Sequence, residues 1–293
     1  MRATESVWVE VFAGAPWQGH GVMVFPEAEG MEAAEMAAVA RGLGAPLTAF
    51  VVAPRRDDCH RRLRVFTPIR ELALSVTAAF AAAAAAPWSR ASLRFEQGVV
   101  ATEVTQGEEG FSMALARPVA GTLSLPDPDA VARALGVGEG DLDPSLPVLA
   151  GNAGLHCLMV AVGGVEALGR VQLQPGLWAG VIEKAKVLGA LAYVCDLDGL
   201  RARFVGPLAG VPEWPCEPLA AAALVRALVE RGRLPVMGAR ETRRVTVRHD
   251  VIAGRDARFA LVYTGAADRD DAVTVYGTAT VRGEGRTWLG PVG

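Results

Sequence analysis

The two halves of the chain repeat one order of apolar and polar positions. In the first half, the apolar strand pattern RRLRVF (Arg61–Phe66) is followed by a loop and an alanine-rich run, Val76–Ala86. In the second half, RARF (Arg201–Phe204) is followed by a loop and the run LAAAALVRALVERG, which begins at Leu219. The spacing is too long for a solenoid repeat and predicts a duplicated domain. Two facing domains of one kind would leave a cleft between them, which is a common place for a ligand.

Both alanine-rich runs are apolar on every side, and a helix of that kind must be enclosed by the rest of its domain. We therefore predict an α+β fold of two similar, pseudo-symmetric domains, each a curved mixed sheet wrapped round a central apolar helix. A pseudo-twofold axis between the domains would turn the amino-terminal ends of both helices toward the cleft. The free N–H groups and dipoles at those ends favour an anionic ligand.

The remaining pattern predicts short strands and a few surface helices. Ser6–Phe12 alternates as a strand does, and Met31–Leu43 has helical spacing with Gly44 as a stop signal. A short helix through Leu135 would be capped by Asp127 or Asp129. Another helix is predicted at 177–188, and further strands at 22–25, 48–52, 93–96, 99–104, 111–115, 155–162, 190–195, 244–247, 259–263 and 273–281. The domains are predicted at 1–125 and 126–293, with the last strands free to return to the first domain.

Composition allows two cores and excludes some partners. Of 293 residues, 51% are hydrophobic and 21% are charged. This balance and length suit two domains of ordinary size. The net charge of −3 and the lack of a basic stripe argue against a nucleic-acid partner. No apolar signal region begins the chain, and the longest apolar run, 76–88, is too short to cross a bilayer. We expect a cytoplasmic protein with no membrane partner.

The four cysteines form no C-x-x-C pair, which argues against a zinc site; we expect no metal and no cofactor. Cys157 and Cys195 lie in apolar strand patterns and are predicted to be buried thiols. Cys216 lies close to a predicted helix start, which would lower its pKa. It is either a nucleophile or an inert thiol.

Several motifs resemble one known family over nearly the whole chain. They are Val9-Glu10-Val11-Phe12 followed by Gly19-His20-Gly21-Val22-Met23-Val24 (family D-A-F … G-N-P-A-A-V), Leu47-Thr48-Ala49-Phe50-Val51 (E-T-A-F-V), Arg64 to Leu74 (R-x-F-T-P-x-x-E-V-x-L), and Phe204 with Gly210-Val211-Pro212-Glu213 (R-x-F … G-I-P-E). In the last motif the arginine is displaced to Arg201 or Arg203. The chain resembles the PhzF-like isomerases of phenazine biosynthesis, which share the diaminopimelate epimerase fold. The resemblance implies a cofactor-independent isomerase and a homodimer.

The chain departs from the family at its proton-transfer positions. The family's catalytic glutamate is Leu47 here, its histidine at the first helix start is Thr77, and its aspartate before the second helix is Trp214. The family's Gly-Ser pair is replaced by Pro218-Leu219, and Ser75 stands where related epimerases have one cysteine of a pair. Leucine and tryptophan cannot accept a proton, so ordinary family proton transfer is not expected.

Eight residues remain as site candidates. His20, Glu217 and Thr77 are the candidate catalytic residues, and the candidate substrate-binding residues are Ser75, Trp214, Cys216, Leu47 and Glu71. Each has a structural alternative: Glu217 would cap its helix or act as a relocated acid or base, and Ser75 and Thr77 would cap theirs or bind ligand. Glu71 would be structural, and Trp214 would either fill the core or stack on a flat ligand.

Three functions fit this pattern. The first is a cofactor-independent isomerase or cyclase of specialised metabolism with altered chemistry, acting on a small molecule, anionic or flat. It would work largely by binding and orienting a reactive substrate. The second is a catalytically inactive homologue that binds a small molecule. The third is a partner of an active subunit.

Overall fold

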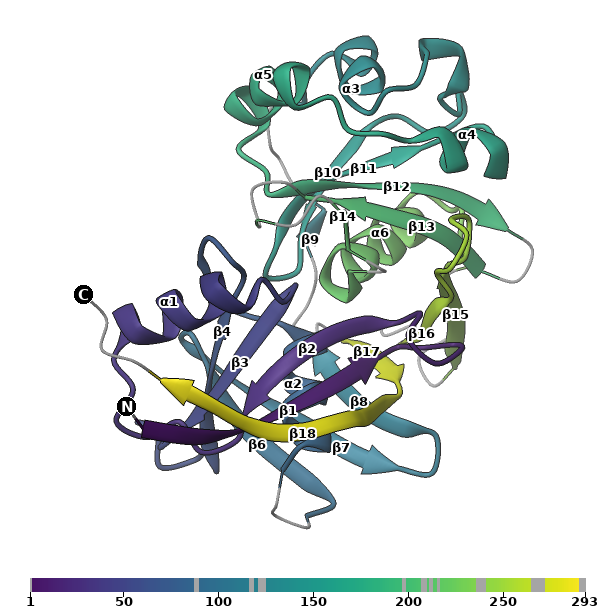
Figure 1. Cartoon of the computed structure of the whole chain (residues 1–293). Coiled ribbons are helices and arrows are strands. Elements are labelled where there is room, and N and C mark those ends of the chain that lie inside the picture. Colours follow the sequence, from purple (N-terminus) through teal and green to yellow (C-terminus); the bar gives the residue numbers. More distant parts are fainter. Residues whose placement is uncertain are drawn as a thin grey trace. The chain divides into compact units, whose positions relative to one another are not determined.

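The chain folds into two compact units. The computed structural model describes residues 2–86, 90–115, 119–120, 125–196, 199–206, 210, 213–214, 217–235, 241–264 and 272–289 (Figure 1). Unit 1 comprises Met1–Ala114, Ala209–Val211 and Val275–Gly293; unit 2 comprises Leu115–Leu208 and Pro212–Thr274. The boundary at 125 and 126 stays a prediction, since residues 121–124 lie outside the described part.

Unit 1 is a curved mixed sheet around one central helix. Its strands are β1 (Arg2–Val11), β2 (His20–Phe25), β3 (Leu47–Val52), β4 (Arg61–Phe66), β5 (Glu71–Leu72), β6 (Ser92–Gln97), β7 (Val100–Gly107), β8 (Gly110–Leu115) and β18 (Ala279–Leu289), and β17 (Val273–Gly277) leads into it from unit 2. The central helix α2 (Val76–Ala84) packs against β1, β2, β3 and β18, as Figure 1 shows. Helix α1 (Ala33–Leu43) lies outside on β3 and β4. It ends at Gly44, whose φ of 63° is the left-handed conformation that favours glycine.

Unit 2 repeats this plan and adds an outer layer of helices. Its strands are β10 (Leu149–Asn152), β11 (His156–Ala161), β12 (Gly189–Asp196), β13 (Gly199–Val205), β14 (Glu213–Trp214), β15 (Thr242–His249) and β16 (Ala257–Thr264), with β9 (Val119–Ala120) paired to β10. The central helix is α6 (Pro218–Glu230). A short 3-10 turn (Glu139–Asp141) and α3 (Pro128–Ala134), α4 (Val165–Arg170) and α5 (Pro175–Ala185) complete it. Side chains of α3, α4 and α5 form one core with β10 to β13, in which Trp178 is the largest member.

Strand pairing shows that the sequence repeat is a structural repeat. β1–β2 and β10–β11 are antiparallel, and β2–β3 and β11–β12 are parallel. The next pairs, β3–β4 and β12–β13, are antiparallel, and the parallel pairs β4–β6 and β13–β15 follow. The predicted α+β class, with a curved mixed sheet around a central helix in each half, is therefore confirmed.

Both central helices are enclosed, as their composition predicts. Every residue of α2 from Val76 to Ala82 is buried, and so are ten of the thirteen residues of α6. Phe80 of α2 contacts Phe12 edge-on, with ring centroids 5.7 Å apart. The alanines allow strands to approach the helix closely on all sides, which is why these segments tolerate so few large side chains.

The prediction for Cys195 is wrong, whereas that for Cys157 is confirmed. Cys157 is fully buried in β11, but Cys195 is exposed. The parallel partner of β12 ends where Ala161 pairs with Tyr193. Beyond Tyr193, β12 is covered by β13 alone, so an apolar pattern there does not imply burial.

One ion pair occurs in both units at equivalent register. Arg64 binds both carboxylate oxygens of Glu71 at 2.7 Å, and Arg203 binds those of Glu213 at 2.7 Å. In each case the glutamate pairs with the residue two positions after the arginine, Phe66 or Val205. The register therefore identifies Arg203, rather than Arg201, as the displaced arginine of the second motif.

The two ion pairs differ in their surroundings. The side chain of Glu71 is 41% exposed, whereas that of Arg203 is only 6% exposed and also donates to the Leu168 carbonyl oxygen at 2.8 Å. His249 lies beside the Arg203–Glu213 pair, with its Nε2 3.4 Å from Glu213 Oε1. Burial lowers the pKa of His249 to about 4, so its ring is neutral at pH 7.

We expect the two pairs to differ in their contribution to stability. Arg203→Met should lower the free energy of unfolding by about 3 kcal/mol, because it leaves the Glu213 carboxylate half-buried without its cation. The matched variant Arg64→Met should cost no more than about 1 kcal/mol, since water can solvate Glu71. Urea denaturation of both variants measures this; equal losses would contradict the asymmetry.

Candidate functional site

The start of α2 is capped by the side chain that precedes it. Ser75 is 4% exposed, and its hydroxyl oxygen accepts a hydrogen bond of 3.1 Å from the Ala78 N–H. Its own N–H donates to Gln97 Oε1 at 3.1 Å. The capping role predicted as the alternative for Ser75 is thus present, and a further contact with substrate stays a prediction.

Thr77 lies in the first turn of α2 and is 1% exposed. Within the described part of the chain, its Oγ1 has no hydrogen-bond partner. A buried hydroxyl without a partner costs about 1–3 kcal/mol. Thr77 Oγ1 is therefore an unused hydrogen-bonding group at this helix end, and a contact with substrate stays a prediction.

His20 begins β2 and is 1% exposed. It follows Gly19, where an added Cβ would lie 2.6 Å from the Val11 carbonyl oxygen, so only glycine fits. The Gly19 N–H donates to Glu10 Oε1 at 2.8 Å. The loop before His20 is thus held by a buried carboxylate of β1.

Glu10 is a site feature that the sequence analysis missed. It is 3% exposed and pairs with Arg282 of β18, whose Nε lies 2.7 Å from Glu10 Oε2. Burial raises the pKa of Glu10, but hydrogen bonds from the Gly19 and Trp17 N–H groups and from Arg282 outweigh it, so the pKa lies below its ordinary value. The only signal in the sequence is that Glu10 occupies the acidic position of the D-A-F motif.

Leu47 and Glu71 have surroundings that suit structural roles. Leu47 begins β3, is fully buried, and pairs with Val22 of the neighbouring parallel strand β2. His20 and Leu47 therefore lie at the same end of two neighbouring strands, since each lies at the start of its strand. The Glu71 carboxylate is held by Arg64 on the surface. A substrate contact of either residue stays a prediction.

At the start of α6, a buried carboxyl group occupies the capping position. Glu217 is 3% exposed, and its Oε1 accepts a hydrogen bond of 3.1 Å from the Leu219 N–H. Burial raises the pKa of Glu217 to about 7, and the Leu219 hydrogen bond opposes that rise only in part. Burial and the Glu217 charge together raise the pKa of the neighbouring Cys157 thiol, which stays protonated.

Glu217 and Ser75 occupy equivalent places in the two units. Each lies four residues after the glutamate of the repeated ion pair, Glu213 or Glu71, and each caps the central helix with a side-chain oxygen. The structure therefore confirms a capping role for Glu217. A titration near pH 7 also makes it fit to exchange protons.

Trp214 of β14 is 1% exposed and packs on Phe204, with ring centroids 5.8 Å apart at an angle of 42°. It is part of the core of unit 2, which is one of its two predicted roles; stacking on a ligand stays a prediction. Cys216 lies outside the described residues, so its predicted role stays open.

His156 begins β11 and makes a hydrogen bond to the side chain of Asn152. Its Nε2 lies 2.6 Å from Asn152 Nδ2, while Asn152 Oδ1 accepts from the Gly154 N–H at 2.8 Å. This arrangement fixes the turn between β10 and β11. His156 is exposed and, within the described chain, has no further polar contact that suggests catalysis.

The described residues contain no group of three His, Cys, Asp or Glu side chains that could hold a metal ion. Helices in the same part of the chain are all too short or too polar to cross a membrane.

Comparisons with known proteins identify the same family that the sequence motifs resemble. The family described as "Phenazine biosynthesis-like protein" matches residues 9–285. An uncharacterized isomerase of Deinococcus radiodurans is 28% identical over 96% of this chain and 94% of its own length. The trans-2,3-dihydro-3-hydroxyanthranilate isomerase of Pseudomonas aeruginosa is 26% identical over 97% of this chain and 99% of its own length.

Among solved structures, the PhzF-family phenazine biosynthesis protein of Bacillus anthracis has a TM-score of 0.85 at 19% identity, covering 99% of this chain and 100% of its own. A hydroxyproline epimerase of Agrobacterium vitis has a TM-score of 0.64 at 14% identity, covering 98% of this chain and 91% of its own. These similarities concern the fold. With the family match over nearly its whole length, the chain belongs to the phenazine biosynthesis-like (PhzC–PhzF) family.

Proposed function

We propose that this chain is a cofactor-independent isomerase or cyclase of specialised metabolism in which Glu217 is the proton-transfer group. The observation that carries the proposal is the Glu217 carboxyl, which is buried at the start of α6 with a pKa raised to about 7. A general acid or base works best when its pKa lies near the working pH. Two family members similar to this chain are named isomerases, which supports the same reaction class.

A single carboxyl group suffices for isomerisation. The Glu217 carboxylate would take a proton from one carbon of the substrate, and the resulting acid would return it to another carbon, so that atoms and charge balance. Within unit 1, Thr77 Oγ1 and the first turn of α2 are proposed to bind an anionic ligand group. In unit 1, His20 is proposed as an acid or base and Leu47 as an apolar substrate contact; in unit 2, Trp214 is proposed as an apolar wall for a flat substrate. Ser75, Glu71 and Cys216 are proposed as further substrate contacts.

A second candidate is an inactive homologue that binds a small molecule or an active partner subunit. It is favoured by Leu47 and Trp214, because both replace family acids and both are almost completely buried. We further propose that the protein is a cytoplasmic homodimer, as the family resemblance implies.

Glu217→Gln should change how stability depends on pH. The folded-state pKa of about 7 lies above the ordinary value of 4.5, so the folded state binds the proton more tightly. The stabilisation is complete below pH 4.5 and is lost as pH rises through 7, by about 3 kcal/mol in all. In the Glu217→Gln variant the amide keeps the cap and does not titrate. Urea denaturation at pH 5 and at pH 8 should therefore show that the free energy of unfolding falls less with rising pH in the variant than in the wild type. An equal fall in both proteins would contradict a raised pKa of Glu217.

The proposed reaction is tested by deuterium exchange. The protein is incubated in D2O with a panel of small hydroxy- and amino-carboxylates, including trans-2,3-dihydro-3-hydroxyanthranilate, and the C–H signals are followed by proton NMR. We expect no exchange with that compound, because Leu47 and Trp214 replace the family's acids. We expect exchange or isomerisation of another panel member, lowered at least about 100-fold by Glu217→Gln.

Glu230→Gln is the matched control, since Glu230 lies at the exposed end of the same helix and pairs with Arg226. It should leave turnover unchanged. Robust exchange with trans-2,3-dihydro-3-hydroxyanthranilate would contradict the proposal. Binding of a panel member without any turnover would favour the inactive homologue.

A further inference from the structure

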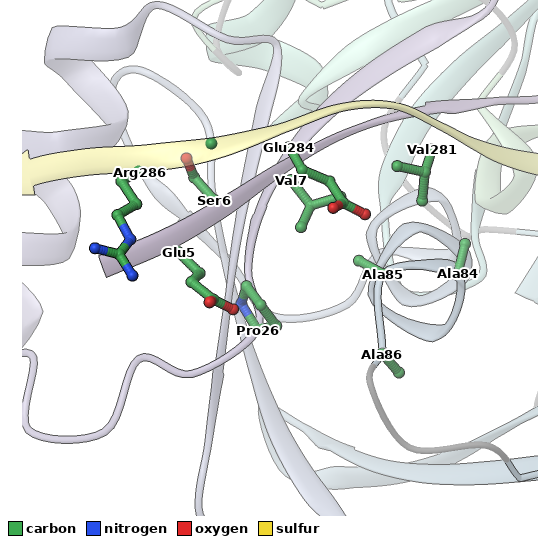
Figure 2. Close-up of a pocket in the computed structure, with 11 residues that line it drawn as sticks. Glu5, Ser6, Val7, Pro26, Ala84, Ala85, Ala86, Val281, Glu284 and Arg286 are labelled. Carbon is green, nitrogen blue, oxygen red and sulfur yellow. The ribbon is translucent and has the colours of Figure 1, made fainter. Parts of the chain in front are cut away.

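A cavity of about 560 Å³ lies within unit 1 at the carboxyl-terminal end of α2 (Figure 2). At the usual rise per residue, a helix as long as α2 spans about 13 Å, so the cavity lies at the opposite end of α2 from Ser75 and Thr77. Its walls come from β1, β18, the residue after β2 and the end of α2: Glu5, Ser6, Val7, Pro26, Ala84, Ala85, Ala86, Val281, Glu284, Gly285 and Arg286. It therefore shares no residue with the candidate site.

The cavity combines apolar walls with a few charged groups. Val7, Val281, Pro26 and the alanines at the end of α2 supply the apolar surface. Its volume lies within the range of about 300–1,000 Å³ that is usual for small-molecule sites, which have this mixture of linings.

Strand register fixes how the charges are arranged. In the β1–β18 pair, Glu5 lies opposite Arg286, and Val7 lies opposite Glu284. The charges of Glu5 and Arg286 offset each other across the strands. Glu284 faces an apolar partner, and Figure 2 shows its carboxylate directed toward the end of α2 that carries Ala85.

The end of α2 adds to the negative potential. The last carbonyl groups of a helix lack intrahelical donors and form the negative end of its dipole. The Ala85 N–H bonds to the Ala81 carbonyl oxygen, but the Ala83 carbonyl has no donor four residues on, because residue 87 is proline. Among the described residues, no ion pair neutralises Glu284.

We propose that this cavity binds a small organic cation, a protonated amine on an apolar body. The ammonium group would lie between the Glu284 carboxylate and the last carbonyl groups of α2. The apolar body would lie against Val7, Val281 and Pro26. The site is independent of the proposed reaction.

Isothermal titration calorimetry with n-hexylammonium tests the site, and hexanoate is the probe of opposite charge. Wild-type protein should bind n-hexylammonium, more weakly as salt is raised, and should not bind hexanoate. Glu284→Gln should weaken binding about fivefold, the effect of one exposed charge. Glu108→Gln, at the exposed tip between β7 and β8, is the matched control and should leave binding unchanged.

Ala85→Leu provides a second variant, which acts through volume rather than charge. The larger side chain would occupy the cavity and should abolish binding, while circular dichroism and the thermal midpoint show that the variant is folded. Binding unchanged in both Glu284→Gln and Ala85→Leu would overturn the proposal, and so would preference for hexanoate. A loss in Glu108→Gln equal to that in Glu284→Gln would also overturn it, since the effect would then reflect net charge alone.

Discussion

An α-helix enclosed on every side must satisfy its first N–H groups inside the protein, because no water reaches them. Both central helices of this chain meet that constraint with the side chain of the residue just before the helix, Ser75 in unit 1 and Glu217 in unit 2. The two capping side chains differ in how they respond to pH. A serine cap is neutral at every pH, whereas a buried carboxyl cap has two protonation states of similar free energy near neutral pH.

The same repeat explains where the second unit differs from the first. An arginine–glutamate pair joins the strand before the helix to the short strand that leads into it, in both units. In unit 1 the pair faces water, and in unit 2 Arg203 is drawn inward to the carbonyl oxygens of Leu168 and Gly169. These two residues belong to helix α4, whose carbonyls give Arg203 hydrogen-bond partners that make burial tolerable. Strand β14 is thus tied to the core of unit 2 through Arg203, whereas β5 is tied to a pair at the surface of unit 1.

Periodicity predicted the elements well where they are long or enclosed, as with Val76–Ala86, Leu219–Arg231 and Met31–Leu43. It missed α4, which has only six residues, too few to show a helical period. It misjudged Cys195, because burial at a strand end depends on which neighbouring strand continues. It did not reveal Glu10 as a site feature, because the Arg282 partner lies at the other end of the chain. The resemblance supplied the candidate positions, but only tertiary structure showed that Glu217 is buried and Glu71 is not.

Two opposing effects set the protonation of Glu217, and burial is the larger of them. Burial favours the neutral acid, while the Leu219 N–H and the positive end of α6 favour the carboxylate. Because the resulting pKa of about 7 lies near neutral pH, a small change in local charge suffices to move the protonation equilibrium. An anionic ligand bound near the start of α6 would raise the pKa of Glu217 further and load it with a proton, whereas the positive charge of an ammonium group would lower it. A buried carboxyl cap thus couples the charge of a nearby ligand to its own proton affinity.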